Sequence, residues 1–103
     1  AGTPIPAAPA ARLDEALAAL ASGDLAGAAE RVDAERRRSP GARELDLVET
    51  AVLGARYVLE GRRDPALLAA ARERLAAFRR KGGSARAEAT LLSPSLRALL
   101  EPR

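Results

Sequence analysis

The sequence predicts an all-α protein made of two stacked antiparallel helical hairpins and a short C-terminal capping helix. Three observations support this fold class. Ala, Leu, Arg and Glu, all strong helix formers, dominate the composition, whereas Val, Ile and Thr are sparse. Apolar residues recur three and four positions apart, as they do along one face of a helix. Capping residues, glycines and prolines separate these periodic segments.

A chain of 103 residues fits one domain, and we divide it into a linker at 1–10 and a helical domain at 11–103. The linker carries Pro4, Pro6 and Pro9 among alanines and has no charged side chain. This composition predicts an extended, semi-rigid segment. It could follow a signal peptide, tether the domain to a membrane segment, or connect two domains. We expect the cell envelope or periplasm rather than the cytoplasm.

The first hairpin is predicted between residues 11 and 40. Gly23 ends a helix that starts near residue 11, and Asp24 caps a second helix that runs to about Arg38. Pro40 closes the unit. Ala28 lies on the apolar stripe of the second helix, so we expect it where the two helices cross most closely. The apolar stripes consist of Leu13, Ala16, Leu17 and Leu20, and of Leu25, Ala28, Ala29 and Val32.

The second hairpin is predicted between residues 42 and 82. Its first helix, at about 42–60, has a broad apolar face that suits the central helix of a bundle. Asp64 and Pro65 start the fourth helix, and Gly82 and Gly83 end it. A weaker helix at about 85–92 and a last one after Ser93-Pro94 complete the domain.

The predicted core is aliphatic, because Tyr57 and Phe78 are the only aromatic residues. We expect these stripe residues to be mostly buried: Leu17, Leu20, Leu25, Val32, Val48, Val52, Leu59, Leu68, Leu75 and Phe78.

The first hairpin resembles a degenerate tetratricopeptide-like repeat. The resemblance rests on Gly23-Asp24-Leu25 at the turn, on the small Ala28, and on the closing Pro40. It covers Leu13 to Pro40, with no large aromatic residue in either helix, and becomes degenerate from Gly41 to Gly83. The resemblance implies paired antiparallel helices and a concave groove that binds a peptide or protein. The chain also looks like Ala/Arg-rich helical-repeat modules found behind proline-rich linkers in bacterial cell-envelope proteins.

The composition excludes several catalytic chemistries. Without Cys or His the chain has no cysteine nucleophile, no Ser-His pair and no usual zinc ligand set. It also lacks a phosphate-binding glycine loop. Carboxylate pairs remain (Asp14/Glu15, Asp33/Glu35 and Glu44/Asp46), but they fit solvated helix faces. We therefore expect no catalytic activity, no cofactor and no metal, and no segment is apolar enough to span a membrane.

Two basic clusters are candidate partner-binding sites. Arg36, Arg37 and Arg38 end the second predicted helix, and Arg79, Arg80 and Lys81 end the fourth. Cations at helix C-termini are favourable by about 0.3–1 kcal/mol each, which explains both clusters without a partner. In an up-down bundle, however, both clusters lie at one end and could meet an acidic partner or phosphates. As exposed charges, they should contribute little to folding.

Tyr57 is the third candidate partner-binding site. It lies off the main stripe of its helix, so its ring is either a peripheral part of the core or an anchor in a binding groove.

Two functions follow from these observations. The first is a non-enzymatic protein–protein interaction or scaffold module of a larger assembly. The alternative is a basic helical domain that binds nucleic acid or another phosphate-bearing ligand. Nucleic-acid binding usually also needs stacking aromatic residues or a reading helix, and neither is present.

Overall fold

The computed structural model describes residues 13–101 and is all-helical over that range. Its six helices are α2 (Leu13–Ala21), α3 (Leu25–Arg38), α4 (Arg43–Leu59), α5 (Pro65–Arg80), α6 (Ala85–Leu91) and α7 (Pro94–Leu100). The predicted linker at 1–10 lies outside the described residues. None of the helices described is long and apolar enough to cross a membrane.

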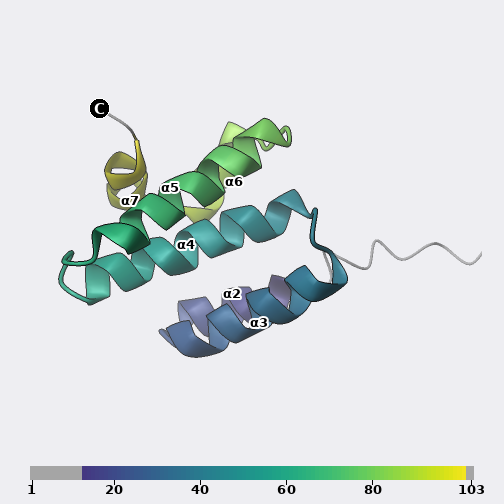
Figure 1. Cartoon of the computed structure of the whole chain (residues 1–103), viewed down its shortest axis with the longest axis horizontal. Helices are drawn as coiled ribbons and strands as arrows, with labels where there is room; N and C mark the ends of the chain where they lie inside the picture. Colours follow the sequence, from purple (N-terminus) through teal and green to yellow (C-terminus); the bar gives the residue numbers. More distant parts are fainter. Residues whose placement is uncertain (1–12, 102–103) are drawn as a thin grey trace, which may run out of the picture.

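The helices form two antiparallel packed pairs, α2 with α3 and α4 with α5 (Figure 1). α4 is the central helix, as predicted, because it packs against α5 and against both helices of the first pair. α6 and α7 pack on the α4–α5 pair.

Local signals set the helix ends as the sequence predicts. The Asp24 carboxylate accepts a hydrogen bond from the Gly27 amide at 2.9 Å, and Asp64 caps α5 through the Ala66 amide at 3.0 Å. Gly23 has φ +84°, a left-handed conformation that suits glycine after a helix. Ser93 caps α7 by accepting from the Leu96 amide at 3.2 Å.

The core consists of two clusters on either side of α4. One lies between α4 and the helices that follow it, and contains Leu47, Ala51, Ala71, Leu75, Phe78, Leu92 and Leu100. The other lies between α4 and the first pair, and contains Ala16, Ala28, Val32, Val48 and Val52. Ala28 is fully buried, as its predicted place between two helices requires.

The predicted core is largely confirmed, with one error. Val32, Val48, Val52, Leu75 and Phe78 are buried. Four further members are half-buried: Leu17, Leu20, Leu25 and Leu68. Leu59 is 71% exposed, because it lies in the last turn of α4, where the apolar stripe continues but the covering helices do not.

Candidate functional site

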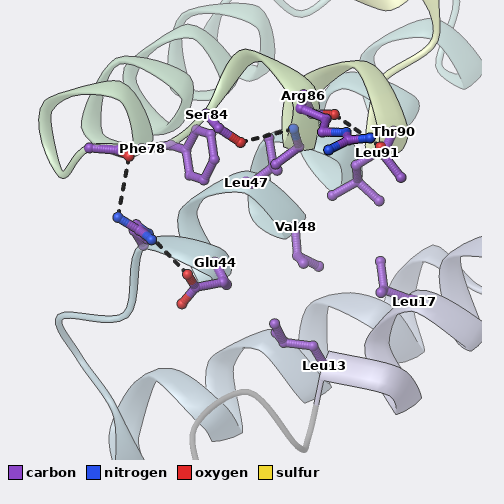
Figure 2. A pocket seen from close by; sticks show the side chains of 13 residues that line it. Leu13, Leu17, Glu44, Leu47, Val48, Phe78, Ser84, Arg86, Thr90 and Leu91 are labelled. Carbon is purple, nitrogen blue, oxygen red and sulfur yellow. Dashed lines mark hydrogen bonds and ion pairs between the residues drawn. The ribbon is translucent and has the colours of Figure 1, made fainter.

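An apolar hollow of about 480 Å³ opens between α2, α4 and α6. We call it the α2–α4–α6 groove. Its apolar lining consists of Leu13, Leu17, Leu47, Val48, Phe78, Ala87 and Leu91. Its polar rim consists of Arg43, Glu44, Ser84, Arg86 and Thr90. Figure 2 shows Leu13 and Leu17 on one side, Leu91 and Arg86 on the other, and Val48 between them.

The turn between α5 and α6 positions one wall of the groove. Gly82 has φ +84° and ends α5, which reverses the chain. Gly83 then lies against the Phe78 ring, so closely that a side chain at this position would overlap the ring. Ser84 caps α6 by accepting a hydrogen bond from the Ala87 amide at 3.1 Å. The buried Phe78 ring and the start of α6 are therefore fixed relative to each other.

Most polar groups of the rim are already bonded within the protein. Arg43 donates from its guanidinium to the carbonyls of Lys81 and Gly82, both at 3.2 Å, and pairs with Glu44 at 3.1 Å. Thr90 donates its hydroxyl to the Arg86 carbonyl at 2.9 Å. The exposed Arg86 guanidinium makes no ion pair within residues 13–101, so it gives the rim an available positive charge.

The two basic clusters meet around a carboxylate that sequence reasoning placed on a solvated face. Asp46 of α4 is fully buried. Its Oδ2 lies 2.7 Å from Lys81 Nζ, and its Oδ1 lies 3.2 Å from an Arg36 nitrogen. Arg74 approaches the same Oδ1 at 3.6 Å, and Glu49 pairs with Arg36 at 2.6 Å. This Asp46 network joins α3, α4 and α5.

Other members of the clusters are paired as well. Arg79 donates to both carboxylate oxygens of Glu88, at 2.8 and 3.0 Å, and to Glu101 at 2.8 Å. The hydrogen bond from Arg79 holds the pKa of the buried Glu88 below its ordinary value, and the same bonds raise the pKa of Arg79.

Arg38 pairs with Glu35 at 2.7 Å, and Arg80 pairs with Glu73 at 3.2 Å. Arg37 is exposed and has no ion pair in the described part of the chain. Arg36, Arg79 and Lys81 pair with the buried carboxylates Asp46 and Glu88, so we now expect these three cations to contribute more to folding than fully exposed charges do.

Tyr57 is half-buried near the end of α4 and does not line the groove. Its carbonyl accepts the Arg62 amide at 2.8 Å in the turn that ends the helix. The structure therefore does not bring Tyr57 together with either basic cluster or with the groove.

The three carboxylate pairs lie in two different settings. Asp14 and Glu15 are exposed on α2. Glu35 and Asp46 are buried, each beside a cation, whereas their neighbours Asp33 and Glu44 are exposed. Across residues 13–101 no group of His, Cys, Asp or Glu is arranged to hold a metal ion.

Sequence reasoning missed the groove, and a weak signal for it existed. Leu47 widened the apolar face of the central helix beyond one stripe, and Leu13 began a stripe on another helix. A broad apolar face predicts more contacts than one neighbour can supply, but nothing in the pattern says which part of the face stays uncovered.

Comparisons of the chain with protein-family models, with curated proteins and with solved structures found no match.

Proposed function

We propose that this domain is a non-enzymatic interaction module of a larger assembly, and that it binds an apolar, acidic polypeptide segment in the α2–α4–α6 groove. The observation that carries this proposal is the incomplete cover over α4. Leu13, Leu17 and Leu91 are only half-buried, and they face a hollow above the buried Leu47 and Val48. A partner that fills the hollow would remove apolar surface from water, at about 25 cal/mol per Å².

The rim favours a polypeptide over a small polar ligand. Small-molecule sites usually add a few convergent polar groups to an apolar lining. Here the Ser84 hydroxyl caps α6 and the Thr90 hydroxyl donates to a backbone carbonyl. With its polar groups occupied in this way, the groove best fits aliphatic or aromatic side chains.

The charge around the groove favours acidic residues in that segment. Arg86 stands on the rim without an ion pair among the described residues, and Arg43 links the rim to the backbone of Lys81. Opposite charge steers encounter and fixes orientation more than it adds affinity. The partner is thus an apolar segment flanked by Asp or Glu.

The arrangement also supports, as part of the same proposal, a tetratricopeptide-like architecture. α2 and α4 each begin an antiparallel helix pair, and α6 follows the second pair along the chain and packs on α4. These three helices line the groove. The resemblance of the first hairpin to a tetratricopeptide-like repeat implies that partners bind on a concave face, and the groove is our candidate for that face. The proline-rich segment at 1–10 fits a module held at a distance from its anchor, and we place the module in the cell envelope.

Phosphate or nucleic-acid binding is the weaker candidate. Arg36, Arg79 and Lys81 are engaged by buried carboxylates, so an incoming phosphate would compete with existing ion pairs. The basic clusters and Tyr57 remain alternative contact surfaces for a protein partner, and the test below separates them from the groove.

The test is a selection from a displayed library of random peptides, followed by calorimetry on the selected sequences. We expect apolar peptides with acidic residues whose binding is lost in the Leu17→Glu and Arg86→Glu variants. Arg86→Glu is the safer of the two for folding, because Arg86 is exposed. Leu59→Glu, an equivalent change outside the groove, should bind as the wild type does.

The proposal fails if the library yields no peptide, or if the selected peptides bind Leu17→Glu and Arg86→Glu unchanged. Loss of binding in Tyr57→Ala or in a charge reversal of Arg37 and Arg80, with the groove variants unaffected, would move the site to those surfaces. Retention of nucleic acid that falls steeply with salt would instead favour the alternative function.

A further inference from the structure

A second apolar hollow lies at the other end of α4. It has a volume of about 370 Å³ and is lined mainly by Gly54, Ala55, Val58, Leu59, Leu96 and Leu99. Gly54 forms its floor, because Leu96 of α7 packs directly against the glycine. Val58 and Leu59 are the exposed large hydrophobic residues of the described chain, at 38% and 71%. Both belong to this one patch, which we call the α4–α7 patch.

Opposite charges stand next to the hollow. Glu60 follows Leu59 and is exposed, and its only ion pair among the described residues is an exposed contact of 3.5 Å with Arg56. Arg62 lines the hollow and has no ion pair in the part of the chain described. The backbone at Arg62 has φ +60°, a left-handed conformation that is uncommon outside glycine. The chain at Arg62 therefore departs from the helical path of α4.

We propose that the α4–α7 patch is a self-association surface that binds a second copy of this chain about a two-fold axis. A two-fold interface must be self-complementary, so each element of the patch needs its counterpart in the same patch. The patch meets this requirement. Leu59 is a protruding apolar side chain, and the hollow beside Leu96 and Leu99 receives the Leu59 of the other copy. Glu60 of each copy then lies opposite Arg62 of the other.

The size of the patch predicts a weak dimer. Standard interfaces bury about 800 Å² on each partner and include about 20–30 residues a side. The α4–α7 patch offers one hollow, one protruding leucine and one charge pair per copy. We therefore expect dissociation constants on the order of 0.1 mM, with association favoured where the chain is held at high local concentration.

The first experiment is sedimentation equilibrium of the full chain from about 10 µM to about 1 mM. The weight-average mass should rise from that of one chain toward twice that value. Leu59→Asp should stay monomeric throughout, because the substitution places a charge in the apolar contact. Leu17→Asp, in the α2–α4–α6 groove, should dimerise as the wild type does, which separates this inference from the proposed function.

The second experiment uses charge exchange, because Glu60→Arg and Arg62→Glu each place like charges opposite one another in a two-fold dimer. Each variant alone should lose association at least tenfold. An equimolar mixture of the two should recover it, since the two arginines of the first variant then face the two glutamates of the second. Circular dichroism of each variant checks that the fold is unchanged.

A wild-type chain that is monomeric over the whole range would overturn the proposal. So would a Leu59→Asp variant that still dimerises, or a mixture that associates no better than the separate variants.

Discussion

At the scale of single residues, small side chains decide how closely the elements pack. Gly83 lies against the ring of Phe78, which is only 2% exposed and therefore has little room to move. The sequence predicts Gly82 and Gly83 together as a helix terminator. Only Gly82, with its positive φ, has that role for conformational reasons, whereas Gly83 is required by close packing.

Gly83→Ala should therefore destabilise the protein by about 1–3 kcal/mol, the usual result of overpacking a core. Gly41→Ala is the matched control, because a methyl group there would meet nothing within 4 Å and the backbone has no positive φ. It should be neutral or slightly stabilising, since alanine restricts the unfolded chain. Urea unfolding measures both changes. Equal effects of the two substitutions would show that the Phe78 contact is unimportant.

At the scale of elements, ion pairs to a buried carboxylate join helices that otherwise pack through a largely aliphatic core. The Asp46 network links the C-terminal ends of α3 and α5 through α4. Its carboxylate is fully buried, whereas the side chains of Arg36 and Lys81 remain 25% and 38% exposed. The two sides of the network therefore respond differently to mutation.

Replacing both Arg36 and Lys81 by Met should cost about 3–5 kcal/mol, because it leaves a buried carboxylate with only the longer contact to Arg74. Adding Asp46→Leu to that double variant should restore much of the lost stability, because the stranded charge is gone. Thermal or urea unfolding of the double and triple variants provides the comparison. A triple variant less stable than the double variant would contradict this account of Asp46.

The contact of α5 with α6 carries a pH dependence. Arg79 lowers the pKa of Glu88 from its ordinary value of 4.5 in the folded state, so the unfolded chain takes up the proton more readily. The stability that Glu88 contributes is therefore complete above the unfolded pKa and is lost as the pH falls through the folded pKa.

The difference in unfolding free energy between the wild type and Glu88→Gln should be constant from about pH 7 to about pH 5 and should shrink toward about pH 3. Urea unfolding across this range gives the difference directly. A difference that does not change with pH would mean that the Arg79–Glu88 bond does not stabilise the ionised form.

These elements also mark the limit of sequence-based prediction. Asp24, Asp64 and Ser93 predicted helix starts correctly, because a cap depends on residues two or three positions away. Asp46 was assigned to a solvated face, because its partner Lys81 is 35 residues distant. Leu59 was assigned to the core, because periodicity indicates which face of a helix is apolar but not where the neighbouring helices stop covering it.

At the scale of the whole molecule, α4 lies between the first helix pair and the helices that follow it (Figure 1), and it separates two core clusters. α4 is not fully covered on the face toward α2 and α6. The fold class and the antiparallel pairs were predictable from composition, periodicity and caps. The groove was not, because it depends on the spacing between α2 and α6, which are far apart in the chain. A broad apolar face on the central helix was the part of the site that the sequence did indicate.

The most direct test of the central claim is an amide chemical-shift titration of the isotope-labelled domain with a peptide selected as described above. We predict that the largest shifts map to the groove, at Leu13, Leu17, Val48, Arg86 and Leu91, and that they saturate together. Shifts confined to Arg36–Arg38 and Arg79–Lys81, or to the surroundings of Tyr57, would contradict the claim that the α2–α4–α6 groove is the binding site.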